Sequence, residues 1–134
     1  MSEFNDRVIQ QFRSNGGSVE GFGRSLVLIH STGARSGVER VNPALSIKVG
    51  SDWLVIASAA GAKQNPGWYH NLVARPNISI ETGNGTVAVT AHELDGEDYA
   101  QAFDRFQRTS AALVKYQEQA GNRRLPIFRL TPRS

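Results

Sequence analysis

The sequence contains no cysteine among its 134 residues, and only three of its fifteen cationic residues are lysines. The absence of cysteine excludes a disulfide framework, a thiolate nucleophile, an iron–sulfur cluster and cysteine-ligated zinc. The longest apolar run, Leu26-Val27-Leu28-Ile29, is far shorter than the roughly 20 residues of a membrane-spanning helix. The first residues lack the apolar segment of a secretory signal. We therefore expect a cytoplasmic protein with one domain, residues 1–134.

Several common catalytic motifs are also missing. The chain has no G-x-G-x-x-G segment, Walker A loop, nucleophile elbow or S-x-x-K motif. The histidines at positions 30, 70 and 92 lack metal-ligand spacing, so we expect structural histidines and no metal site. No pair of carboxylates is placed for acid–base catalysis.

A net charge of +3, carried mainly by twelve arginines, is the main compositional signal. The planar guanidinium matches phosphate and carboxylate oxygens, so an anionic partner is one explanation, and a preference for arginine codons is another. The arginines are scattered without an accompanying aromatic strip. Nucleic acid is therefore not the expected partner.

Hydrophobic periodicity predicts a mainly β protein with helices. Phe4, Val8, Ile9 and Phe12 recur at helical spacing, and we expect this helix to pack on the domain, with at most peripheral membrane contact. Strands are expected over residues 25–31, 38–49, 53–59, 78–81, 87–92 and 126–130. The absence of βαβ alternation favours a small antiparallel β-barrel of about six strands with three helices packed outside.

Proline and glycine mark several boundaries. Pro43 lies inside a predicted strand and indicates an edge or a bulge. Asn65 is expected to cap a helix with Pro66 as its first residue. Asn84-Gly85 is a strong hairpin signal. Asp95 begins one long predicted helix whose inward residues are Tyr99, Phe103, Phe106, Leu113 and Val114.

The segment from Thr32 to Arg40 is a first candidate site. Gly33 and Gly37 would allow backbone N–H groups to converge on an anion, with Arg35, Arg40 and Ser36 as further donors. A plain hairpin turn with solvated arginines explains the same residues.

Two further segments carry small or aromatic residues. Ser58-Ala59-Ala60-Gly61 follows the most buried predicted strand and would let a flat ligand or a phosphate approach the backbone, or it is a simple loop. Trp68, Tyr69 and Asn71 share the start of a helix, where they could wall an aromatic cofactor. Core packing explains Trp68 equally well.

Together these segments identify a family resemblance. The chain resembles the deazaflavin (F420)-dependent nitroreductase family, also described as F420H₂-dependent quinone reductases, within the flavin-binding split-barrel superfamily. The matching motifs, in order along nearly the whole chain, cover residues 12–17, 32–37, 40–43, 57–61, 66–72 and 123–127.

The resemblance implies one split-barrel cofactor-binding domain that binds coenzyme F420 rather than FMN. Arg35, Ser36 and Arg40 would hold the phosphate or adjoining carboxylates, and Lys63 would assist with the anionic tail. The full implied set is Arg35, Ser36, Arg40, Asn42, Pro43, Ala57, Ser58, Ala59, Lys63, Trp68 and Asn71. Tyr116 is a candidate proton donor.

The implied reaction is hydride transfer from F420H₂ to a small electron-poor acceptor: a quinone, an unsaturated lactone such as a coumarin, or a nitroaromatic. Ala34 and Ala59 stand where many relatives have basic residues, and Leu45 stands where nitroreducing relatives often have tyrosine. Quinones and lactones are therefore expected before nitroimidazoles. A non-catalytic F420-binding or storage protein is the alternative, and split barrels of this kind are often homodimers.

Overall fold

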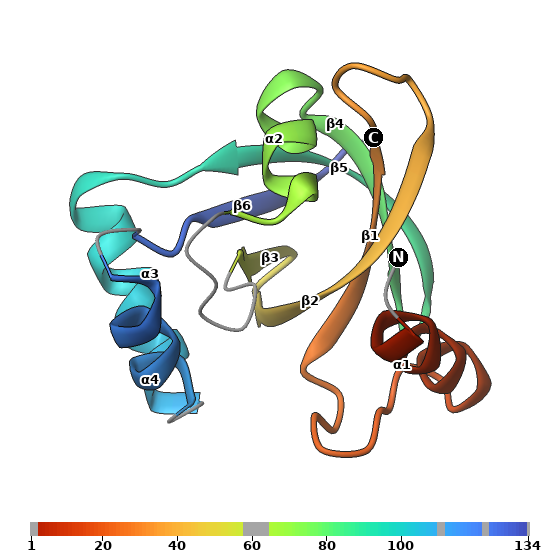
Figure 1. Cartoon of the computed structure of the whole chain (residues 1–134), viewed down its shortest axis with the longest axis horizontal. Coiled ribbons are helices and arrows are strands. Elements are labelled where there is room, and N and C mark those ends of the chain that lie inside the picture. Colours follow the sequence, from red (N-terminus) through yellow and green to blue (C-terminus); the bar gives the residue numbers. More distant parts are fainter. Residues whose placement is uncertain (1–2, 58–64, 110–111, 122–123, 134) are drawn as a thin grey trace.

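The computed structural model describes residues 3–57, 65–109, 112–121 and 124–133. Six strands form a closed antiparallel barrel in the order β1-β2-β3-β6-β5-β4 (Figure 1). This confirms the predicted fold class. The strands are β1 (Leu26–Thr32), β2 (Glu39–Val49), β3 (Asp52–Ile56), β4 (Asn77–Thr82), β5 (Gly85–Glu93) and β6 (Ile127–Pro132).

The described helices are α1 (Glu3–Ser14), α2 (Gly67–Ala74), α3 (Gly96–Thr109) and α4 (Ala112–Ala120). The prediction of one long helix after Asp95 is wrong, because α3 and α4 are separate elements that pack together. A continuous helix over these residues would be about 37 Å long at about 1.5 Å per residue. Tyr99 and Ala120 would lie about 31 Å apart in such a helix, whereas both pack in the same cluster.

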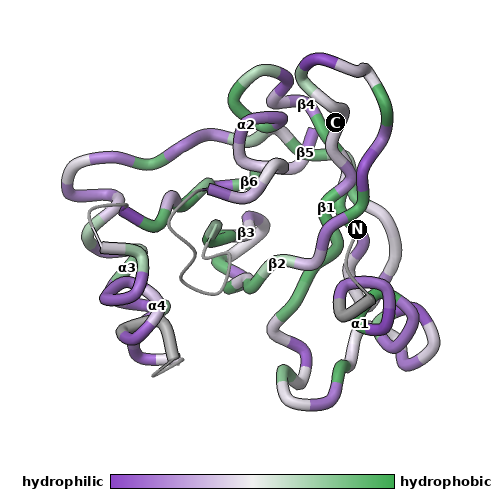
Figure 2. Tube along the Cα trace, in the orientation of Figure 1, coloured by the Kyte–Doolittle hydropathy of each residue, from purple (hydrophilic) through white to green (hydrophobic). Residues whose placement is uncertain are grey.

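Apolar residues alternate along the strands, so one set fills the barrel and another set lies under the helices. The predicted packing of the first helix is confirmed: Val8, Ile9 and Phe12 on α1 cover Leu26 and Leu28 on the outer face of β1. A second outer layer lies beneath α3 and α4. Figure 2 shows hydrophilic and hydrophobic stretches following one another along α1 and α3, as expected for helices with one covered face.

The helix α2 differs from the predicted arrangement. Trp68 and Leu72, one helical turn apart, pack in the same cluster as the barrel-lining residues Ile29 and Phe128. The helix therefore closes one end of the barrel instead of covering its outer wall (Figure 1). Pro66 occupies the position before the first helical residue, so the predicted cap and first residue are displaced by one position.

The strand β2 has two different neighbours along its length. Residues 39–45 pair with β1, whereas pairing with β3 begins only at Leu45 and continues to Val49. Among the described strands, residues 39–44 thus have one unpaired edge, which we call the open edge of β2. Pro43 lies on this segment, in agreement with the predicted edge position, because proline lacks a backbone donor.

The predicted β4–β5 hairpin is confirmed, with its loop one residue earlier than expected. Thr82 pairs with Gly85, so Gly83 and Asn84 form a two-residue loop. A Cβ atom on Gly83 would lie 2.5 Å from the backbone oxygen of Gly16. Only glycine permits this close approach between the hairpin and the segment that follows α1.

The side chain of His30 on β1 contacts acidic residues on both neighbouring strands, β2 and β4. Its Nε2 atom lies 2.5 Å from Glu81 on β4, and its Nδ1 atom lies 3.2 Å from Glu39 on β2. Arg13 at the end of α1 donates two hydrogen bonds to Glu81, at 3.0 and 2.6 Å. The hydrogen bonds from Arg13 and His30 hold the pKa of Glu81 below its ordinary value of 4.5.

Candidate functional site

The turn between β1 and β2, residues 33–38, is held by its own hydrogen bonds. The Gly33 N–H donates to the carbonyl of Val38 at 2.8 Å, and the Gly37 N–H donates to the carbonyl of Gly33 at 3.0 Å. The Val38 N–H donates to the Ser36 hydroxyl oxygen at 3.2 Å. These three backbone donors are paired within the turn, so they are not available to an anion.

Asn71 connects the β1–β2 turn to α2. Its side-chain oxygen accepts a hydrogen bond from the Ala34 N–H at 3.0 Å, and its amide nitrogen donates to the Ser31 hydroxyl at 3.1 Å. Asn71 is only 9% exposed. A buried amide with both ends paired fixes the position of the turn against the helix.

Arg35 and Arg40 are exposed on either side of Ser36 and Gly37. Within the described ranges of the chain, neither arginine forms an ion pair. Arg40 pairs with Ser31 across β1 and β2, which places it next to the residue that bonds Asn71. Two available guanidinium groups beside a fixed turn are suited to phosphate or carboxylate oxygens.

Asn42 and Pro43 lie half-buried on the open edge of β2, two and three residues along the strand from Arg40. The edge supplies backbone groups that a flat ligand could approach. Ala57 is fully buried in the barrel core, and its N–H donates to the carbonyl of Pro126 at 2.8 Å. The predicted residues Ser58, Ala59 and Lys63 lie outside the described residues.

The predicted aromatic residues Trp68 and Tyr116 occupy different parts of the molecule. Trp68 is only 6% exposed, and its ring centroid lies 6.2 Å from that of Phe128, so core packing accounts for its position. Tyr116 on α4 is half-buried against the cluster under α3 and α4. Figure 1 shows α4 and α2 on different sides of the barrel, so Tyr116 does not join the other candidates.

Tyr69 has a polar partner that periodicity alone could not reveal. Its hydroxyl lies 3.1 Å from both carboxylate oxygens of Glu93, which is 24 residues away on β5. Burial, followed by the hydrogen bond to Glu93, raises the pKa of Tyr69 above its ordinary value. The hydroxyl therefore keeps its proton to higher pH than an ordinary tyrosine hydroxyl does, near the end of the barrel that α2 closes.

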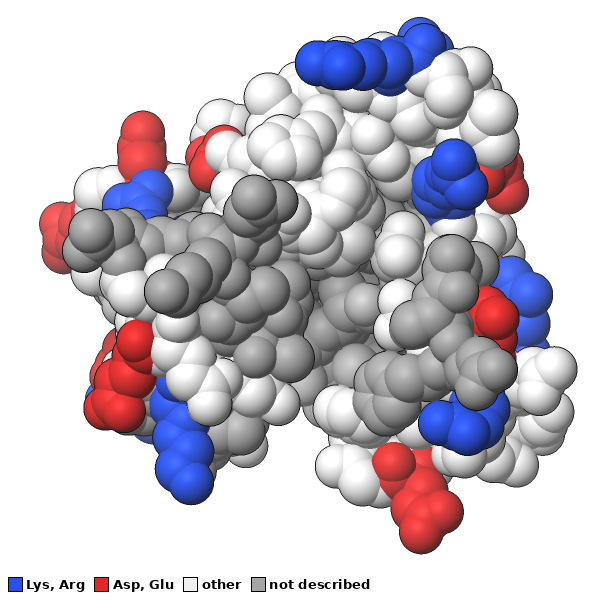
Figure 3. Space-filling model, in the orientation of Figure 1, with Lys and Arg blue, Asp and Glu red and all other residues white. Residues whose placement is uncertain are grey.

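The charged residues show no single basic surface on the face drawn in Figure 3. Lys and Arg side chains lie in separate positions there, with Asp and Glu side chains between them. Among the described residues, no three His, Asp or Glu side chains gather in a group that could hold a metal ion. No described helix is long and apolar enough to cross a membrane.

Comparison with known proteins supports the resemblance seen in the motifs. The family model described as F420H(2)-dependent quinone reductase matches residues 4–132. An F420H(2)-dependent quinone reductase of Mycobacterium tuberculosis is 32% identical over 109 residues, which cover 80% of this chain and 73% of the relative.

Solved structures show the same relationship. An F420-H2 dependent reductase is similar with a TM-score of 0.72 and 30% identity, covering 80% of this chain and 94% of that one. A structure described as a domain-swapped dimer has a TM-score of 0.73 and 28% identity, with coverage of 93% and 97%. The chain therefore belongs to the F420H(2)-dependent quinone reductase family and is an oxidoreductase whose cofactor is coenzyme F420.

Proposed function

We propose that this enzyme uses F420H₂ to reduce small electron-poor acceptors, with quinones and unsaturated lactones such as coumarins as the preferred classes. The observation that carries the proposal is the exposed pair Arg35 and Arg40, which flank a turn fixed to α2 through Asn71. This arrangement fits an anionic cofactor because its two cations have no acidic partner among the described residues.

The hydrogen-bond donors near the β1–β2 turn suggest that the anionic groups and the ring of the cofactor bind to two adjacent surfaces. Arg35, Arg40 and the Ser36 hydroxyl would hold the phosphate or carboxylate groups, because their donors match those oxygens. The open edge of β2, with Asn42 and Pro43, is the proposed surface for the deazaflavin ring. Ala57 would support that surface from the core, where its side chain is fully buried.

F420H₂ supplies a hydride to the acceptor when it is bound. The chain contributes by binding the cofactor and the acceptor, orienting them toward each other and excluding water from between them. These tasks require neither a nucleophile nor a metal. Asn71 would hold the turn in place, while Trp68 and Leu72 would keep water out of the barrel core beneath it. The proton that completes the reduction would come from water or from a nearby hydroxyl.

The choice of acceptor rests on the side chains around the proposed site. Leu45 provides no hydroxyl at the position where nitroreducing relatives often carry tyrosine, and it packs against the apolar layers under the helices. Tyr116 lies on the α4 side of the barrel. Both positions favour quinone or lactone reduction over nitroimidazole reduction, because the latter would be expected to depend on such a donor.

An acceptor panel tests this proposal. The initial rate of F420H₂ oxidation should be measured under anaerobic conditions with menadione, coumarin and a nitroimidazole at equal concentrations. We expect the fastest rate with menadione or coumarin. If the nitroimidazole gave the fastest rate, the proposed acceptor preference would be wrong, although the dependence on F420H₂ would still hold. If the protein bound F420 tightly without any turnover, a storage role would be favoured instead.

We further propose a homodimer, in line with the domain-swapped dimer among the similar structures. Light scattering coupled to size-exclusion chromatography should give a mass of twice 14.6 kDa. A mass equal to that of one chain at micromolar concentration would contradict it.

A further inference from the structure

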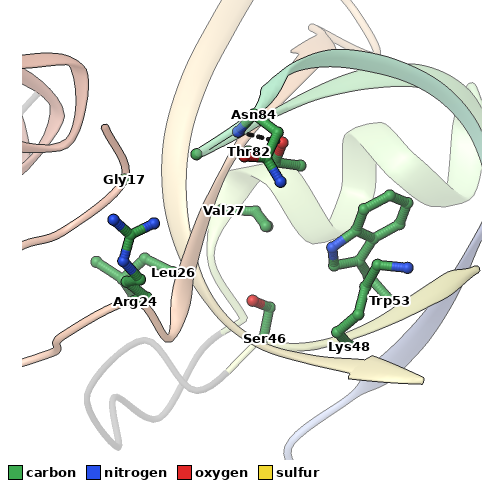
Figure 4. A pocket seen from close by; sticks show the side chains of 10 residues that line it. Gly17, Arg24, Leu26, Val27, Ser46, Lys48, Trp53, Thr82 and Asn84 are labelled. Carbon is green, nitrogen blue, oxygen red and sulfur yellow. Dashed lines mark hydrogen bonds between the residues drawn. The ribbon is translucent and has the colours of Figure 1, made fainter. Parts of the chain in front are cut away.

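A cavity of about 240 Å³ lies at the end of the barrel opposite α2 (Figure 4). It is formed where β1 begins, where β2 ends and where the β4–β5 hairpin turns. The β1–β2 turn lies at the other end of β1, about 20 Å away at roughly 3.3 Å per residue. The lining residues are Gly17, Arg24, Leu26, Val27, Ser46, Lys48, Trp53, Thr82, Gly83 and Asn84. None of them belongs to the set proposed for F420.

The cavity exists because inward-facing positions become polar towards this end of the barrel. Ser46 pairs with the inward-facing Val55, and Lys48 pairs with Trp53, so both polar residues point to the barrel interior. Thr82 follows Ile80 by two residues and therefore lies on the same inward face. These shorter or solvent-seeking side chains leave the end of the barrel unfilled.

The charge of the lining is of one sign. Arg24 and Lys48 contribute two cations, whereas none of the ten lining residues is Asp or Glu. Arg24 donates to the carbonyl of Gly16 at 3.3 Å, and Lys48 donates to the carbonyl of Gly50. Each cation is thereby oriented by a neutral oxygen and lacks an acidic partner among the described residues.

Apolar and neutral polar groups complete the surface. The Lys48 ammonium lies 4.4 Å from the centroid of the Trp53 ring, and Figure 4 shows Val27 between this pair and Arg24. The backbone N–H of Asn84 donates to the Thr82 hydroxyl oxygen at 3.1 Å, while the Asn84 side-chain amide has no hydrogen-bond partner among the described residues. The lining thus offers an aromatic ring, an aliphatic wall, an amide and two cations to one ligand.

We propose that this cavity is a second binding site, which takes a small organic anion with one flat apolar ring, such as an aromatic carboxylate. Its volume is below the range of about 300–1,000 Å³ typical of sites for drug-sized ligands, so a single ring is the appropriate size. The carboxylate would bind Lys48, and the ring would lie against Trp53 and Val27, while Arg24 on the opposite side of the cavity would add to its positive charge. Since the two lining sets share no residue, this ligand and F420 can bind together.

Benzoate and benzamide provide matched probes, because they share a ring and differ in charge. Trp53 and Trp68 are the two tryptophans, so their indole N–H signals can be followed in ¹H–¹⁵N spectra and assigned with Trp53→Phe. We expect benzoate to shift the Trp53 signal saturably at low salt while the buried Trp68 signal stays in place. Benzamide should bind at least tenfold more weakly.

Lys48→Met removes the charged terminal group and keeps an unbranched side chain up to the ε position, and Lys115→Met on the exposed surface of α4 is the matched control. Lys48→Met should weaken benzoate binding about tenfold, as expected for the loss of a charge-assisted contact. Lys115→Met should not change it, and F420 affinity should be unchanged in both variants. The proposal would be overturned by any one of three results. These are benzamide binding as tightly as benzoate, Lys48→Met binding benzoate as tightly as the unmodified protein, and the absence of a saturable shift of the Trp53 signal.

Discussion

The side-chain oxygen of Asn71 accepts a hydrogen bond from the backbone N–H of Ala34 at 3.0 Å. The two residues are 37 positions apart in sequence, and their contact joins the closing helix α2 to the turn that carries Arg35. The same amide donates to Ser31 at 3.1 Å. One buried side chain thus sets the position of the proposed anion-binding turn.

Replacing Asn71 should therefore weaken both the fold and cofactor binding. Asn71→Ala removes the hydrogen bond from Ala34 and leaves the buried Ser31 hydroxyl without its donor, at a cost of about 1–3 kcal/mol in the free energy of unfolding. We expect a weaker affinity for F420 because the turn is no longer held against α2. Thermal unfolding and an absorbance titration with F420 measure the two effects.

Ser31→Ala is the matched control for that variant. It removes the partner of the Asn71 amide nitrogen but keeps the bond from Ala34 to the side-chain oxygen. Its affinity for F420 should remain close to that of the unmodified protein. If both variants lose F420 affinity equally, general destabilisation rather than the position of the turn is responsible.

Arg35→Ala and Arg40→Ala should each raise the F420 dissociation constant about tenfold, because each removes a charge-assisted contact. Both residues are exposed, so the midpoint of thermal unfolding should change little. Arg105→Ala, an exposed arginine on α3, is the control. Unchanged F420 affinity in both turn variants would remove this turn from the cofactor site.

Glu81 should contribute a pH-dependent part of the stability. Its pKa is lowered by Arg13 and His30 in the folded protein, so the stabilisation is present above its ordinary value of 4.5 and is lost as the pH falls through the lower folded value. Glu81→Gln should lower the unfolding midpoint at neutral pH, and the difference should shrink in acid. Glu118→Gln, at an exposed position on α4, should show no such trend. A pH-independent difference for Glu81→Gln would contradict the argument.

Local patterns predict much of this fold. The alternation of Ile78 and Ile80, followed by that of Val87 and Val89, predicts the β4–β5 hairpin because its partners are close in sequence. Closure of the barrel depends on pairing between β3 and β6, as at Val55 and Phe128. Because these residues are so far apart in sequence, no local pattern indicates which strand pairs with which.

The candidate site likewise has parts that local sequence predicts and parts that depend on contacts between distant segments. Arginine and glycine in the β1–β2 turn mark an anion-binding candidate from sequence alone. The contact between Asn71 and Ala34, the bond from Tyr69 to Glu93 and the cavity beside Trp53 each combine segments distant in sequence. Periodicity also cannot distinguish a helix that closes a barrel from one that covers its wall, because both bury one face.

The decisive test of F420H₂-dependent reductase activity is the initial rate of F420H₂ oxidation by menadione, measured with and without the protein under anaerobic conditions. We expect a rate that is proportional to protein concentration, saturates with F420H₂ and falls when Arg35 and Arg40 are both replaced by alanine. A rate equal to the protein-free rate, with menadione and with every other quinone, enone or nitroarene, would contradict it.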